Sequence, residues 1–188
     1  EAAAVVAELV QSSTTLRELD LSDNNVGENL VKEVNGETVV IKPAPGLTTI
    51  CQALRTSSLT ALDLSRNNID TGGCYVLATA LKGENENNPR NNSGGNKGGG
   101  KGCPSLRSLA LDGNPVTTGW TVAGTSHRGG LAIAEALRSN TTLETLCWKG
   151  GDKAACRLPS KVVVALAKTL AKFNDTIVEL DLSGNACG

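Results

Sequence analysis

Residues 16–26 read LRELDLSDNNV, and the chain returns to nearly the same pattern three times. The later copies are LTALDLSRNNI at 59–69, LRSLALDGNPV at 106–116 and IVELDLSGNAC at 177–187. A weaker copy starts at Leu143, with Trp148 in a place that Leu occupies elsewhere and Gly151 in the place of Asn. Five copies of one pattern predict a structure that stacks similar units.

The spacing L-x-x-L-x-L-x-x-N has a physical reason. Hydrophobic residues two apart lie on one side of a short strand, so each copy turns one side toward a core. The Asn that follows can bond the backbone of adjacent turns, whose polar groups would otherwise be buried without partners. Stacking predicts a ladder of these amides, formed by Asn24, Asn67, Asn114 and Asn185.

Helical periodicity fills the stretches between the strand motifs. Small and aliphatic residues recur at helical spacing over 72–83, 129–143 and 160–177, and the stretches 10–16 and 52–59 fit the same scheme. Ser160 is the expected N-cap of the last helix. The order strand, Asn turn, helix, polar turn and strand therefore repeats along the chain.

On these motifs the chain resembles the leucine-rich repeat family, specifically its ribonuclease-inhibitor-like class. It is also similar to the repeats of NOD-like receptors and of Ran GTPase-activating proteins. The resemblance implies an α/β solenoid, or horseshoe, with a parallel sheet on the concave side and helices on the convex side. Residues 1–188 would form one such domain of about five repeats, within a longer chain. Members of the family are mostly binding scaffolds.

The chain departs from the family in its long insertions. Successive motifs begin 43, 47, 37 and 34 residues apart, against about 28 in the family's unit. The surplus lies at 34–46, 83–102, 117–128 and 148–158, and Asn35-Gly36 between alternating runs predicts a hairpin in the first insertion. Residues 83–102 are a low-complexity Asn/Gly insertion. Such insertions either carry binding specificity or reflect neutral drift in length.

Composition argues against several classes of function. The net charge of −1 favours neither nucleic acid nor a membrane surface, and no apolar run approaches the ~20 residues of a membrane helix. His127 is the sole histidine, so neither a nucleophile–base pair nor a metal site is expected. GNKGGGK at 95–101 resembles a phosphate-binding loop but is followed by Gly102 where Ser or Thr is needed. We expect no catalysis and no cofactor.

The six cysteines favour free thiols over a disulfide framework. Cys51 and Cys74 fall at helical spacing among aliphatic residues and are expected in the core. Free thiols indicate a reducing, cytoplasmic setting. The glycosylation acceptors at Asn91, Asn140 and Asn174 point outside the cell, but the last two fall in turns where Asn has a structural use.

Alternation predicts which side chains line the open concave face. The candidate partner-binding residues are Glu18, Asp20, Ser22, Asp63, Ser65, Asp112, Lys149, Glu179 and Asp181. The two ends of this face are acidic, and its centre is small and weakly polar. Either Leu-Asp-Leu-Ser is the common filler of such repeats, or the face binds a partly basic partner.

The leading hypothesis is a non-enzymatic protein–protein interaction scaffold, part of a larger intracellular protein or assembly, that uses the concave face and the inserted loops. The sequence does not identify the protein partner or the oligomeric state. One alternative is a GTPase-activating protein of the Ran type. Others are an innate-immune-type receptor sensor domain and an extracellular repeat domain.

The fourth repeat carries a prediction of its own. An indole at Trp148 exceeds the volume of the Leu that it replaces, and Gly151 removes an amide from the ladder. We therefore expect the solenoid to be irregular over 148–158, with Trp148 partly covered by its own insertion. The alternative is a fully buried Trp in an undisturbed repeat.

Overall fold

The computed structural model describes residues 2–35, 37–82, 102–117 and 127–185. The low-complexity insertion up to residue 101, the segment GNKGGGK and residues 118–126 lie outside these ranges. The described elements are, in chain order, α1 (Ala2–Ser12), β1 (Glu18–Asp20), β2 (Leu30–Val34), β3 (Glu37–Lys42), α2 (Pro45–Leu54), β4 (Ala61–Asp63), α3 (Thr71–Lys82), β5 (Ser108–Ala110), α4 (Arg128–Leu137), β6 (Thr145–Cys147), the 3-10 helix η2 (Ala154–Cys156), α5 (Ser160–Phe173) and β7 (Glu179–Asp181).

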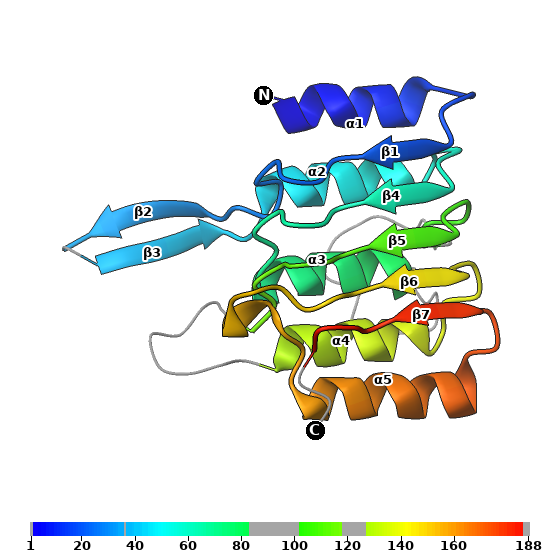
Figure 1. Cartoon of the computed structure of the whole chain (residues 1–188). Coiled ribbons are helices and arrows are strands. Elements are labelled where there is room, and N and C mark those ends of the chain that lie inside the picture. The colour runs from blue at the N-terminus through cyan, green and yellow to red at the C-terminus, as the bar shows by residue number, and fades with distance from the viewer. Residues whose placement is uncertain (1, 36, 83–101, 118–126, 186–188) are drawn as a thin grey trace, which may run out of the picture.

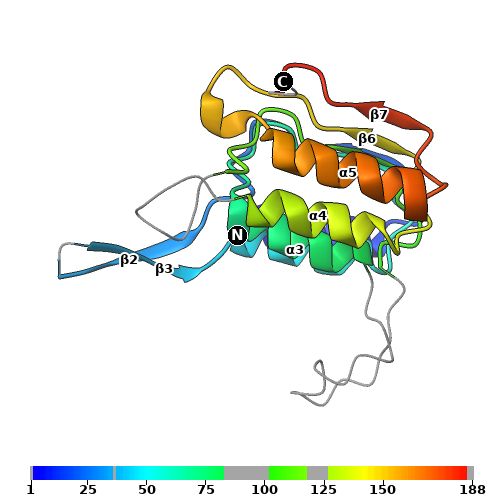
Figure 2. The ribbon, with the colours of Figure 1, turned by 90° about the horizontal axis from the view of Figure 1, so that it is seen from below.

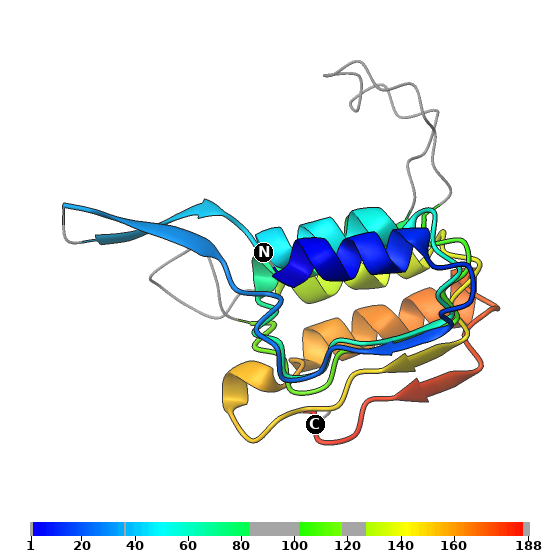
Figure 3. The ribbon, with the colours of Figure 1, turned by 90° about the horizontal axis from the view of Figure 1, so that it is seen from above.

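The five motifs form one parallel sheet in the order β1-β4-β5-β6-β7 (Figure 1). Equivalent leucines stand in register, Leu19 beside Leu62 and Leu109 beside Leu146. A helix precedes each strand, and the helices stack in a second layer on one side of the sheet (Figures 2 and 3). This arrangement confirms the predicted α/β solenoid.

The core lies between the sheet and the helix layer and is aliphatic. Along β4, β5 and β6 the central Leu is buried while its two neighbours are only partly covered. Leu47, Leu77 and Ile133 of the helices are also fully buried. Each such side chain contributes about 1.5–3 kcal/mol. Cys51 and Cys74 are buried among them as predicted, and burial raises the pKa of both thiols.

The predicted hairpin forms as β2 and β3, which pair antiparallel. Asn35 adopts a φ of 53° at the turn, a conformation that Asn tolerates better than most residues. The hairpin projects away from the two layers (Figure 1). It leaves five large apolar side chains exposed, namely Leu30, Val31, Val34, Val39 and Ile41.

Two predicted helix boundaries were wrong. The helix expected at 52–59 begins at Pro45, inside the stretch assigned to the first insertion, because proline suits the first turn of a helix. The N-cap of α5 is Pro159 and not Ser160. The carbonyl oxygen of Pro159 accepts the first helical bonds, from the N–H groups of Val162 and Val163.

The fourth repeat is regular along its strand. Trp148 is 2% exposed, so its indole is a core group. β6 pairs in register with both neighbours, and the Trp148 N–H donates to the Asp181 carbonyl at 2.8 Å, as the equivalent Leu111 N–H donates to Cys147. The predicted irregularity was therefore wrong at Trp148, since the strand holds the indole without opening.

The irregularity begins at Gly151. Its N–H donates to the carbonyl oxygen of Cys156 at 2.9 Å, so the insertion closes on itself around the 3-10 helix. Leu158 then takes the buried hydrophobic place, and its N–H donates to the Asn185 Oδ1 at 2.7 Å. The break is thus confined to 151–157, and the regular pattern resumes at Leu158.

Candidate functional site

The side of the sheet that faces away from the helices is uncovered by any described element (Figures 2 and 3). We call this side the open face. Its side chains come from positions flanking the central leucines, such as Ala61 and Asp63 around the buried Leu62. Parallel sheets are usually covered on both faces. An open parallel face is therefore a surface that a partner can occupy.

Three predicted carboxylates on the open face accept hydrogen bonds from the turns that follow their strands. The Oδ1 atoms of Asp20, Asp63 and Asp181 accept the N–H of the serine two residues later, at 2.8, 2.8 and 3.0 Å. Hydrogen bonds from Ser22 and Ser183 hold the pKa of Asp20 and Asp181 below the ordinary value. This Asx-turn use explains why Asp recurs there irrespective of any partner.

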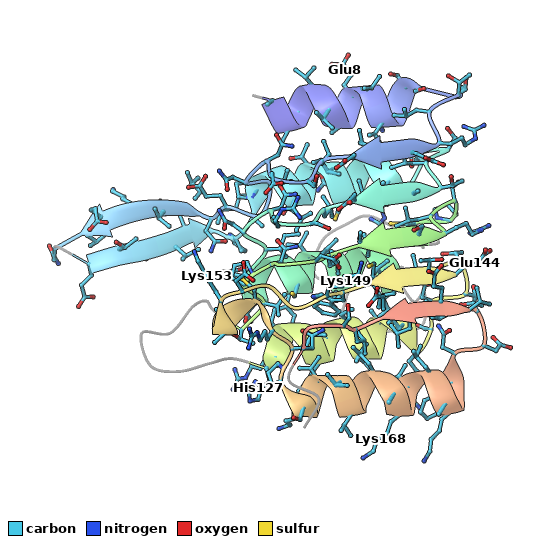
Figure 4. All side chains as sticks on the ribbon, in the orientation of Figure 1. Glu8, His127, Glu144, Lys149, Lys153 and Lys168 are labelled. Atoms are coloured by element: carbon cyan, nitrogen blue, oxygen red, sulfur yellow. The ribbon has the colours of Figure 1, made fainter. Side chains whose placement is uncertain are left out.

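Ion pairs between neighbouring repeats neutralise part of the acidic charge on and beside the open face. The Arg66 guanidinium binds Asp23 through two nitrogens, at 2.6 Å for the closest pair. Lys149 Nζ lies 3.3 Å from Asp181 and 3.9 Å from Asp112 (Figure 4). These side chains are partly exposed, so solvent screening keeps the contribution of each pair to stability small. They leave the centre of the face nearly neutral.

Cys147 lies on the open face but is poorly suited to nucleophilic chemistry. Its thiol lies 3.5 Å from Asp112 Oδ2. Desolvation, reinforced by this carboxylate, raises the pKa of Cys147 to about 11. A thiol with such a pKa stays protonated near pH 7, and the thiolate is the reactive form.

The remaining candidates differ in how accessible they are. Glu18 and Glu179 are exposed at opposite ends of the sheet, and only Glu179 has a weak contact, with Thr145 Oγ1 at 3.4 Å. Ser22 is half-buried. Ser65 is only 4% exposed because turns on both sides flank it, so its predicted place on the binding surface needs correction.

The structure places the four predicted asparagines in equivalent turns. Asn67 Oδ1 accepts the N–H of Asn24 and of Val26, and Asn114 Oδ1 accepts the N–H of Asn67 and of Ile69, all at 2.8–3.1 Å. Asn67 and Asn114 are fully buried. The amides of Asn67 and Asn114 therefore each join their own turn to the preceding repeat.

A second polar row, at the other end of the strands, was not predicted as a ladder. Asn140 and Asn174 are buried, and their Nδ2 atoms donate to the carbonyls of Leu81 and Leu137 at 2.9 and 2.7 Å. Their Oδ1 atoms accept backbone N–H groups of their own turns. The N-x-T that precedes both β6 and β7 was the available signal. The asparagines of these two sequons therefore stabilise the fold through buried hydrogen bonds.

Other kinds of site have little support in the part of the chain that the structure describes. No three His, Cys, Asp or Glu residues gather there in a way that could hold a metal ion. His127 sits at the N-terminus of α4 (Figure 4). The five described cysteines are free thiols, whereas Cys187 lies outside the description. Among the described helices none has the length and apolarity to span a membrane.

Comparison with known proteins agrees with the repeat geometry. The sequence signature described as "Leucine Rich repeat" matches residues 12–29 and 57–78. This is a leucine-rich repeat fold. A solved structure of the leiomodin-1 actin-binding site 2 is similar, with a TM-score of 0.61, 20% identity, and coverage of 94% of this chain and 76% of that one.

A second similar leucine-rich repeat structure is the tropomodulin C-terminal domain from Caenorhabditis elegans. It has a TM-score of 0.58 and 12% identity, over 97% of this chain and 83% of that one. No curated protein sequence matches the chain. At these identities the likeness concerns the fold.

Proposed function

We propose that this leucine-rich repeat is a protein-binding module, not an enzyme, and that its open face is the main binding surface. The observation that carries the proposal is the uncovered parallel sheet, which presents side chains from five adjacent strands. Glu18 and Glu179 are exposed there and serve no turn, unlike Asp20 and Asp181. A partner with basic groups spaced to reach both ends would complement this pattern.

The hairpin supplies a second contact area. Its base is fixed, because Asn29 Oδ1 accepts the Ala44 N–H at 3.0 Å and Asn29 Nδ2 donates to Asp70 at 2.8 Å. β2–β3 and η2 both follow the carboxyl ends of strands and lie at the same end of the sheet (Figure 1). Figures 2 and 3 show the hairpin level with the helix layer, so its exposed apolar side chains form a contact area separate from the open face.

Actin is the first partner to test, since one similar structure is an actin-binding site. We expect the chain to bind monomeric actin in sedimentation-velocity experiments. Reversing Glu18 and Glu179 together to Lys should weaken binding at least about fivefold if basic groups of the partner face them. Gln52→Lys, on the exposed side of α2, adds a positive charge away from the open face and should bind like the unmodified chain.

Two results would oppose parts of this proposal. Absence of binding would remove actin as the partner. Equal effects of the double reversal and of Gln52→Lys would remove the open face as the site. The Ran-type alternative predicts a different readout, faster GTP hydrolysis by a small GTPase, and the same preparations can be assayed for it.

A further inference from the structure

The β2–β3 hairpin has an apolar face that no described part of the solenoid covers. The hairpin lies within the chain, between β1 and β4, and projects sideways to the direction in which the repeats stack (Figures 1 and 3). No other described element packs extensively against either of its strands. The exposure of the hairpin is therefore a property of this insertion and not of the first or last repeat.

The strand register sorts the exposed apolar side chains by face. Lys32 pairs with Val39 and Val34 pairs with Glu37, and residues directly opposite each other share a face. Side chains two residues apart in one strand also share a face. One face therefore carries four of the five large apolar side chains, each between 43% and 58% exposed, namely Leu30, Val34, Val39 and Ile41. We call this side the apolar face of the hairpin.

The opposite face of the hairpin is more polar. There the Thr38 hydroxyl donates a hydrogen bond to the Glu33 carboxylate, and Val31 lies opposite the half-buried Val40. A two-stranded hairpin is at best marginally stable in water unless a further layer packs on its apolar side. The apolar face is therefore the side on which the hairpin lacks a second layer.

The charge on the apolar face is balanced and suits a second copy of the same face. Lys32 lies at its centre and Glu37 next to the turn, and neither has an ion-pair partner among the described residues. If a twofold axis runs along the strands, β2 of one copy lies over β3 of the other. Lys32 then lies over Val39 of the other copy, two residues or roughly 7 Å from Glu37 along that strand. Both side chains are long enough to meet, and the symmetry forms the pair twice.

We propose that two copies of this chain dimerise by packing the apolar faces of their hairpins against each other. The contact joins the same surface of both copies, so it is closed and stops at a dimer. It involves neither the open face nor a partner bound there. Dimerisation is therefore independent of the proposed function.

The size of this contact predicts a weak dimer. Four side chains per copy, each about half exposed, offer less than the roughly 1,200 Å² that stable protein complexes bury. We expect a dissociation constant of roughly 10–1,000 μM. Dimers would therefore form where the chain is concentrated.

Sedimentation equilibrium of the 188-residue chain up to about 1 mM tests this proposal. We expect a monomer–dimer equilibrium without larger species. Ile41→Glu places a charge in the apolar contact and should weaken dimerisation at least about tenfold. Val31→Glu is the matched control, because it makes the same charge change at a similarly exposed position on the opposite face. It should change the dissociation constant less than about twofold.

Charge reversal tests the twofold arrangement. Lys32→Glu and Glu37→Lys should each weaken dimerisation several-fold, because each variant brings like charges together in both symmetric pairs. An equimolar mixture of the two variants should dimerise at least as well as the unmodified chain, since opposite charges meet again in the mixed dimer. A mixture that associates no better than the separate variants would overturn the proposal.

Three further outcomes would contradict it. A chain that stays monomeric to about 1 mM would leave the apolar face to a segment of another protein. Equal losses from Ile41→Glu and Val31→Glu would indicate pairing through the free edge of a strand. Association that both variants leave unchanged would indicate a different surface. Circular dichroism of each variant checks that the solenoid is folded.

Discussion

The second and fourth repeats use different residues to hydrogen-bond the turn that follows their strand. In the second, Asn67 is buried and its amide makes hydrogen bonds to the first repeat and to its own turn. In the fourth, Gly151 has no side chain, and the loop bonds to itself through Cys156. Asn185 of the last repeat then bonds to Leu158, beyond the inserted residues.

The comparison shows that the ladder needs a buried hydrophobic residue and a backbone N–H at the right place, not a fixed number of residues between them. Ile69 and Leu158 are both buried and both donate their N–H to the Asn of the next repeat. The extra residues of the fourth repeat are excluded from the core as a local loop. This is how an insertion is tolerated without loss of register.

Replacing Trp148 should have the largest effect on stability. Trp148→Ala is expected to lower the free energy of unfolding by about 3–5 kcal/mol, because the cavity lies in a closely packed core. Trp148→Leu should lose about 2 kcal/mol, although Leu occupies this place in the other repeats. Urea denaturation measures both. A loss below about 1 kcal/mol for Leu would mean that the fourth turn is not built around the indole.

The intact ladder can be broken at Asn67. Asn67→Ala removes the partners of the Asn24 and Val26 N–H groups and of the Leu21 and Ser65 carbonyls, and should cost about 3 kcal/mol. The control is Asn24→Ala. Because Asn24 is exposed and at the end of the ladder, its loss should be below about 1 kcal/mol. Equal losses would contradict a role for burial.

Asn185→Ala tests the rung that spans the insertion. It removes the acceptor of the Leu158 N–H and the donor to the Trp148 carbonyl, and should cost about 1–2 kcal/mol because Asn185 is only half-buried. Amide exchange should accelerate at Leu158 more than at Ile69. Unchanged exchange at Leu158 would show that the insertion holds its own position.

Replacing Arg66 should have the smallest effect on stability of the substitutions considered. Its φ is 52°, and the equivalent residues of the third and last repeats are Gly113 and Gly184, also at positive φ. Arg66→Ala removes the exposed pair with Asp23, so it should lower stability only slightly, and less at high salt. Arg66→Gly should be more stable than Arg66→Ala by about 1 kcal/mol, since glycine relieves the left-handed strain. The reverse order would contradict this account of the turn.

Local patterns explain what sequence could predict here. Period-two alternation located all five strands, and Asn-Gly located the hairpin. The start of α2 was missed because only Pro43 and Ala44 separate the hairpin from the helix, with no polar turn between them. The burial of Ser65 depends on neighbouring repeats 43 or more residues away, which a single motif does not encode.

The uneven cover of equivalent leucines has a consequence for motion. Leu62, Leu109 and Leu146 are sealed on both sides, while Leu19 is half-buried and Leu180 is exposed. In a one-dimensional stack each unit is stabilised mainly by its neighbours. In a preparation of residues 1–188 alone, thermal opening should therefore begin at the two terminal repeats and spread inward, with the slowest exchange in β5. The chain would then unfold as a graded series of partly open states, not as one all-or-none unit.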